Sequence, residues 1–171
     1  YDLMPNVFFY QLYDLYPNAG PEVDFQFQSV ADRFLEAVRA MGGHDAPWEP
    51  AYMNYRAWKF KTMQPNPNGV PEPEAAGAYA WVLYHAWKKT GNPEYRKGAE
   101  WSIEFLNNWT TNPSYERQLP YGTYTAAKMN AELGTDYNIE KMINWSFDRG
   151  ALRGWGTIVG KWGGFDVSGL V

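Results

Sequence analysis

The chain has 171 residues, a formal net charge of −4 and no cysteine. The lack of cysteine excludes disulfide bonds and thiolate metal sites. The sequence contains no basic run interleaved with aromatic residues, so a nucleic-acid partner is not expected. No apolar run approaches the ~18 residues of a membrane-spanning helix, so no membrane partner is expected.

The aromatic content is unusual, with nine Trp, thirteen Tyr and nine Phe. Many of these residues fall in segments expected to be loops rather than on helical faces. Flat aromatic surfaces with polar edges suit stacking against the C–H faces of sugars, and they also suit ordinary packing. The composition therefore leans toward a carbohydrate-handling protein.

The first third of the chain predicts one clear helix. Residues 1–23 are dense in apolar side chains but are interrupted by prolines and glycine, which favours a short helix or irregular segment followed by a loop. Residues 24–41 are expected to form an amphipathic helix that ends at two glycines. Its apolar positions recur at helical spacing; they are Phe27, Val30, Ala31, Phe34, Leu35 and Val38.

Residues 44–72 are expected to be rich in loop, because five prolines exclude a long helix across them. A short helix over residues 53–61 is compatible with the pattern. A connection of this length in a compact domain is often functional. Tyr55 and Trp58 in this segment are therefore candidates for substrate binding.

Residues 71–109 predict two helices joined by a tight turn. Pro73 suits a first helical position. Apolar residues then recur at helical spacing on one face; they are Tyr79, Val82, Leu83, Ala86 and Trp87. Because Trp81 and Tyr84 occupy the opposite side, this helix is expected to be buried nearly all round.

The turn between these two helices contains residues that typically end one helix and begin the next. Gly91 supplies a left-handed stop, Asn92 an N-cap and Pro93 the first position of the next helix. That second helix is amphipathic, with an apolar side and a charged side. An inner helix followed by an outer helix, as in a helical double ring, needs this combination.

The last third predicts two further helices and a glycine-rich end. One helix runs from residue 121 or 122 to 133 and stops at Gly134, and a shorter one covers residues 138–148. The stretch after it is rich in glycine and aromatic residues. Thr157 to Val159 are compatible with a short strand.

Two segments resemble a known superfamily. Residues 74–106 (EAAGAYAWVLYHAWKKTGNPEYRKGAEWSIEFL) resemble a repeat hairpin of the (α/α)6 toroids, the six-hairpin glycosidases. Residues 112–147 (NPSYERQLPYGTYTAAKMNAELGTDYNIEKMINWSF) resemble a segment of bacterial secreted proteins of that kind. The resemblance implies an all-α fold, in which helical hairpins form part of an (α/α)6 toroid with long aromatic loops, and a periplasmic or secreted bacterial protein.

The number of predicted helices falls short of a complete ring. Six hairpins require twelve helices and more than about 300 residues, whereas about five helices are predicted here. We therefore expect residues 1–171 to be a single domain that forms a partial toroid within a larger protein. The remainder of that protein, or another subunit, is expected to cover its open helical edge.

The function implied by the resemblance is glycoside hydrolysis of a polysaccharide or oligosaccharide. Two carboxyl groups usually carry out this acid/base chemistry across the scissile bond. No catalytic residue transfers from the resemblance, so the candidates rest on their placement in loops or at helix starts. We select Glu74, Asp166 and Glu116, with Glu49 and Glu72 as further carboxylates of the same kind. The substrate-binding candidates are Tyr55, Trp58, Tyr121, Arg153, Trp155 and Trp162.

Two other readings remain open. The first is a non-catalytic glycan-binding or scaffold protein of the same fold, without a spaced carboxylate pair. The other is a sugar epimerase or polysaccharide lyase; an epimerase would use histidine, and the chain has only His44 and His85. Both histidines are expected to be structural. No phosphate-binding loop, dinucleotide motif or metal-binding histidine pair is present, so no cofactor or metal is expected.

Overall fold

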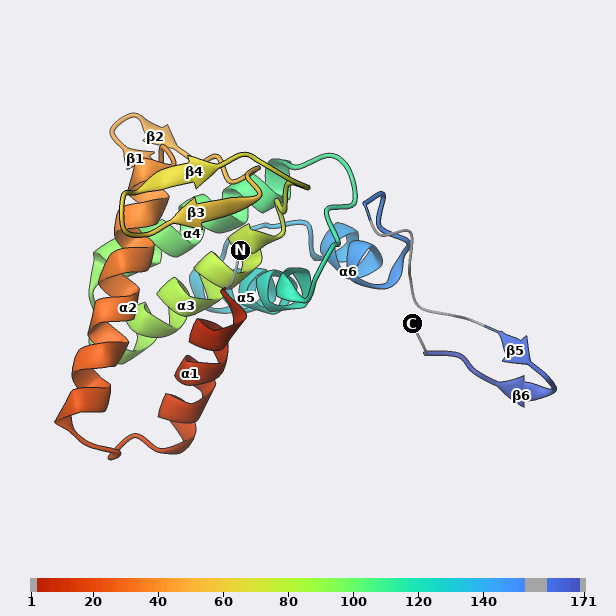
Figure 1. The fold of residues 1–171 in the computed structure, drawn as a ribbon, viewed down its shortest axis with the longest axis horizontal. Coiled ribbons are helices and arrows are strands. Elements are labelled where there is room, and N and C mark those ends of the chain that lie inside the picture. The colour runs from red at the N-terminus through yellow and green to blue at the C-terminus, as the bar shows by residue number, and fades with distance from the viewer. Residues whose placement is uncertain (1–2, 153–159, 170–171) are drawn as a thin grey trace.

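The computed structural model describes residues 3–152 and 160–169. Over these residues the chain is mostly helical and carries three short β-hairpins (Figure 1), which confirms the all-α class. The helices are α1 (Met4–Leu15), α2 (Pro21–Ala40), α3 (Ala75–Thr90), α4 (Pro93–Asn108), α5 (Gln118–Leu133) and α6 (Ile139–Phe147). The strands are β1 (His44–Asp45), β2 (Trp48–Glu49), β3 (Ala57–Lys59), β4 (Gln64–Asn66), β5 (Lys161–Trp162) and β6 (Phe165–Asp166).

Helices α1 and α3 lie side by side and run in the same direction. Tyr10 of α1 meets Trp81 of α3 edge to face, with 6.5 Å between the ring centroids. Farther along both helices, the Nζ of Lys89 lies 5.2 Å from the ring centroid of Tyr13. Because the residue numbers on both helices rise together between these contacts, the two helices are parallel.

Helices α3 and α5 are parallel in the same way. The Trp81 and Tyr121 rings meet edge to face at 5.7 Å, and the Nζ of Lys88 lies 2.8 Å from a carboxylate oxygen of Glu132. The chain therefore places every other helix in one row, in the order α1, α3, α5. Helices α2 and α4 connect the members of this row, and α6 follows α5. Each of these three helices packs against the row, and we call them the outer helices.

Side-chain contacts join the outer helices to one another. The buried hydroxyl of Tyr95 on α4 donates a hydrogen bond to Asp32 of α2 at 2.5 Å, and the amide of Gln28 donates to that hydroxyl at 3.0 Å. Lys141 of α6 donates to the carbonyl oxygens of Asn107 and, at 3.1 Å, Trp109. These carbonyls end α4 and lack partners inside the helix, so the lysine caps it.

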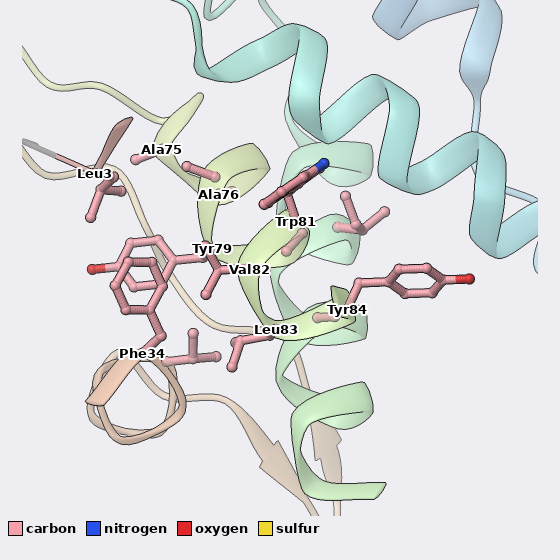
Figure 2. Packing of buried hydrophobic residues seen from close by; sticks show 14 of the residues in the cluster. Leu3, Phe34, Ala75, Ala76, Tyr79, Trp81, Val82, Leu83 and Tyr84 are labelled. Carbon is pink, nitrogen blue, oxygen red and sulfur yellow. The ribbon is translucent and has the colours of Figure 1, made fainter. Parts of the chain in front are cut away.

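Helix α3 is the centre of the core, as the sequence predicted. Its first ten residues are all buried, and the two faces carry different neighbours. Tyr79 packs on Phe34 of α2 at 5.0 Å between centroids, whereas Trp81 points the other way, toward α5 (Figure 2). Burial of each such large apolar side chain contributes about 1.5–3 kcal/mol.

The predicted helix stop and helix start in the α3–α4 turn are confirmed. Gly91 adopts a left-handed conformation with φ of 74°, and the side-chain oxygen of Asn92 accepts a hydrogen bond from the backbone N–H of Glu94 at 3.0 Å. Pro93 is the first residue of α4, and Gly134 ends α5 as expected. Two helices begin earlier than predicted: α2 at Pro21, which suits a first helical position, and α5 at Gln118.

The short helix considered for residues 53–61 is wrong, because β3 and β4 form an antiparallel hairpin there. Trp58 pairs with Pro65 in this hairpin, and exposure alternates along β3 from a half-buried Ala57 to a buried Trp58 and an exposed Lys59. The Nε1 of Trp58 donates to the sulfur of Met63 at 3.4 Å. Burial of the Trp58 ring on one face of the β3–β4 hairpin favours a strand over a helix in this segment.

The C-terminal hairpin β5–β6 projects away from the helices in Figure 1. The strand expected over residues 157–159 lies outside the described residues. Among the described helices, none combines the length and the apolar character needed to cross a bilayer.

Candidate functional site

A pocket of about 320 Å³ opens on the row of parallel helices. Its wall combines aromatic rings with amide and imidazole groups from α1, α3 and α5. The lining residues are Gln11, Trp81, His85, Pro120, Tyr121 and Tyr124. A volume of this size is at the lower end of the range for small-molecule sites.

Trp81 and Tyr121 form the inner wall of the pocket. Trp81 is only 4% exposed, and its ring stands at 87° to that of Tyr121. The hydroxyl of Tyr121 lies 3.5 Å from the side-chain amide nitrogen of Gln11, which donates to it. The pocket therefore has an apolar wall of two rings set at right angles, with a polar group at its edge.

His85 lies one helical turn after Trp81, and the two rings stack with centroids 3.8 Å apart. The Nδ1 of His85 is 2.7 Å from the carbonyl oxygen of Trp81. A carbonyl oxygen only accepts, so Nδ1 carries the proton and the neutral ring keeps its lone pair on Nε2. Burial lowers the pKa of His85 below its ordinary value, which keeps the imidazole neutral near pH 7.

Tyr124 forms the outer rim and is 52% exposed. Beyond it, the carboxylate of Glu132 accepts hydrogen bonds from Lys88 at 2.8 Å and from the Tyr84 hydroxyl at 2.5 Å, and Lys128 lies 3.4 Å away. The hydrogen bond from Lys88 is the main reason that the pKa of Glu132 falls to about 2. The charges nearest the rim are therefore paired with one another.

Glu74 lies outside this pocket, enclosed between α3 and the start of α5. One carboxylate oxygen accepts from the backbone N–H of Glu116, and the other accepts from the N–H of Leu119 at 3.3 Å. Burial raises the pKa of Glu74 to about 7 against the opposing effect of these N–H groups. The carboxyl group thereby fastens the first turn of α5 to α3, which explains why α5 begins at Gln118.

A second buried carboxylate lies nearby. Glu72 forms an ion pair with Arg56 and accepts a hydrogen bond from the side-chain amide of Gln118 at 3.2 Å. The other side-chain atom of Gln118, its Oε1, is buried without a hydrogen-bond partner in the described part of the chain. Of the five carboxylates considered from sequence, the structure brings Glu72, Glu74 and the backbone of Glu116 to this one end of the helix row.

Asp166 is not brought to the same place. It lies exposed on β6, in the projecting hairpin, and its carboxylate accepts from the backbone N–H of Ser168 at 3.0 Å, which lowers its pKa. Trp162 belongs to β5 of that hairpin, opposite Phe165. Arg153 and Trp155 lie outside the described residues.

Tyr55 and Trp58 belong to the segment between α2 and α3. The Tyr55 ring is half-buried against Tyr52 at 5.4 Å, and Trp58 is buried beneath its hairpin. Neither residue lines the pocket between α1, α3 and α5. Glu49 is exposed on β2, in the hairpin that Trp48 attaches to α4 by a 2.6 Å hydrogen bond to Glu104.

Sequence reasoning found Tyr121 in the pocket but missed Gln11, Trp81, His85 and Tyr124. The available signal was the spacing of Trp81 and His85, which lie four residues apart on the α3 side opposite Tyr79. An aromatic ring and an imidazole at this spacing share one helical face.

Within residues 3–152 and 160–169, no three His, Cys, Asp or Glu side chains gather as metal ligands would. Comparison with known protein families, curated proteins and solved structures found no match.

Proposed function

We propose that the chain binds carbohydrate in the pocket between α1, α3 and α5. The observation that carries this proposal is the aromatic wall of Trp81 and Tyr121 with Tyr124 at the rim. Aromatic faces pack well against the C–H faces of sugar rings, and the amide, hydroxyl and imidazole at their edges offer both donors and acceptors to sugar hydroxyls.

We further propose that these helices form part of an (α/α)6 toroid, with the rest of a longer chain or another subunit along the open edge. The parallel row α1, α3, α5 and the connecting outer helices support this arrangement. In such a ring the pocket would face the centre, where a glycan chain has room to pass. A periplasmic or secreted bacterial location fits the same proposal.

A glycan array followed by titration calorimetry tests carbohydrate binding. Tyr124→Ala should weaken the binding of an array hit about 5- to 50-fold, because the half-exposed ring contributes stacking area without supporting the core. Tyr16→Ala is the matched control, since Tyr16 is 65% exposed and lies outside the pocket. Equal effects of the two substitutions, or no array hit, would contradict the proposal.

Glycoside hydrolysis is the second candidate, and the raised pKa of Glu74 favours it. A carboxyl group that holds its proton near pH 7 is in the state that a general acid requires. Glu116, exposed and adjacent, is the second carboxylate of this pair. This candidate requires the enclosed Glu74 to become accessible to substrate.

Release of reducing sugar from polysaccharides separates the two candidates. Hydrolysis predicts that Glu74→Gln and Glu116→Gln each abolish turnover while Asp166→Asn does not. If the wild type and the variants bind glycan but none of them releases reducing sugar, hydrolysis is contradicted and carbohydrate binding remains as the proposed function.

A further inference from the structure

We infer that His85 makes the pocket selective for neutral sugars over uronic acids at neutral pH, and that acidification reverses this preference. The inference rests on the proposed function, because it concerns which carbohydrate the same pocket takes. Its basis is the orientation of the imidazole between the Trp81 ring and the pocket.

The first step is the hydrogen bond of Nδ1 to the Trp81 carbonyl, which turns that nitrogen back toward the helix backbone. The stack on Trp81 holds the ring plane in place. Nε2 is the remaining polar atom of a side chain that lines the pocket, and no hydrogen bond within the described segments uses it. It is therefore the atom available to a ligand.

The second step is the polarity of Nε2. With the proton on Nδ1, Nε2 presents a lone pair and accepts hydrogen bonds only. A sugar hydroxyl can donate to it. The carboxylate of a uronic acid has only acceptor oxygens, so at the same position it would face the lone pair with its own negative charge.

The third step is the set of charges around the ring. Asp14 of α1 and Glu132 of α5 favour the protonated imidazole, Lys128 of α5 opposes it, and the Tyr84 ring stands edge to face at 6.2 Å. Burial outweighs the carboxylates and lowers the pKa of His85. Lys128, a cation at the rim, is paired with Glu132, so it does not offer an unpaired charge to a uronate.

Acidification changes both properties of Nε2. Once the pH falls below the pKa of His85, Nε2 carries a proton, donates a hydrogen bond and adds a positive charge. An ionised uronate then gains a charge-assisted hydrogen bond, whereas a hydroxyl can reorient and accept. The ratio of uronate to neutral affinity should therefore rise as the pH falls.

Matched ligand pairs test this inference. Methyl glucoside and methyl galactoside differ from methyl glucuronide and methyl galacturonide only at C6, where a hydroxymethyl group becomes a carboxylate. NMR titrations begin at about pH 7.5 and are repeated at successively lower pH, while the His85 ring signals in the same samples show where the imidazole gains its proton. We expect the neutral sugars to bind about 3- to 10-fold more tightly than the uronates while the ring is neutral, and the preference to reverse once it is protonated.

Two variants assign the effect to His85. His85→Gln keeps a polar side chain without titrating, so it should bind with a uronate-to-neutral ratio that does not change with pH. His44→Gln is the matched control, because His44 also directs Nδ1 to a carbonyl, that of Pro47 at 3.0 Å, but lies outside the pocket. This control should retain the full pH effect.

Each outcome decides a different point. Sugar binding with no pH-dependent change in the ratio, or the same change in His85→Gln, overturns the inference and leaves carbohydrate binding standing. Failure of every sugar to bind overturns both. A ¹⁵N spectrum that shows the neutral His85 ring protonated on Nε2 overturns the inference without any ligand.

Discussion

Gly77 of α3 and Gly122 of α5 bring their two helices into backbone contact. A Cβ atom built on Gly122 would lie 2.7 Å from the Cα of Gly77, and one built on Gly77 would lie 2.4 Å from the carbonyl oxygen of Gln118. Real Cβ atoms do not approach backbone atoms this closely, so only glycine fits at either position. The crossing lies one turn before Trp81 on α3 and next to Tyr121 on α5, so it brings these two pocket-lining residues close together.

Gly77→Ala and Gly122→Ala should each destabilise the protein by about 1–3 kcal/mol, because the helices must separate. Alanine in an unconstrained helix would instead stabilise it by about 0.5–1 kcal/mol. Urea unfolding followed by circular dichroism measures the difference.

The control for these variants is Gly98→Ala on α4. A Cβ there would meet the ends of the Leu83 and Leu35 side chains, which can move, rather than backbone. We expect a smaller loss than at the crossing. A loss at Gly98 equal to that at Gly77 would contradict the account of the crossing.

The buried carboxyl of Glu74 predicts how stability depends on pH. Its pKa is about 7 in the folded chain against an ordinary value of 4.5, so the folded state binds the proton more tightly. Its contribution to stability is therefore fully present below pH 4.5 and is lost as the pH rises to about 7. The full change is at most about 3 kcal/mol.

Unfolding free energies measured between about pH 4.5 and pH 8 check this slope. Glu74→Gln should remove the part of the slope that belongs to this residue. It should also lower stability at acidic pH, because an amide NH₂ cannot accept the Leu119 N–H. Glu140→Gln, on the exposed side of α6, is the control, and an identical slope in both variants would refute the assignment.

The hydrogen bonds from Lys141 of α6 to the end of α4 are expected to stabilise the packing of these two helices. Lys141→Met keeps the length of the side chain but removes the ammonium that caps the Asn107 and Trp109 carbonyls. We expect a loss of about 1–2 kcal/mol and faster amide exchange in the last turn of α4. Lys59→Met, an exposed change on β3, should leave both measurements unaltered.

Local signals in the sequence were sufficient for most helices. The α3–α4 turn needs only Gly91, Asn92 and Pro93, which act on their own neighbours, and each occupies its predicted place. The start of α5 was not predictable in this way, because Glu74 reaches it from 42 residues away along the chain. The β3–β4 hairpin likewise depends on the packing of Trp58 into the core cluster, which the pattern of a three-residue strand does not reveal.

The pocket was only partly predictable for a related reason. A buried face of α3 and a ligand-facing one carry similar residues, so Trp81 was assigned to the interior and His85 to a structural role. Tertiary placement of α1 and α5 separates the two roles. The toroid remains a prediction, because the six helices are compatible with it without closing a ring.

The parallel course of α1, α3 and α5 gives this row of helices, taken by itself, an electrical direction. Each helix carries roughly half a positive charge at its N-terminal end and half a negative charge at its C-terminal end. Aligned side by side, these ends add rather than cancel. Glu72 is buried at the positive end, and Lys88 and Lys89 stand in the last turn of α3 at the negative end. The side chains thus balance a field that the backbone itself creates.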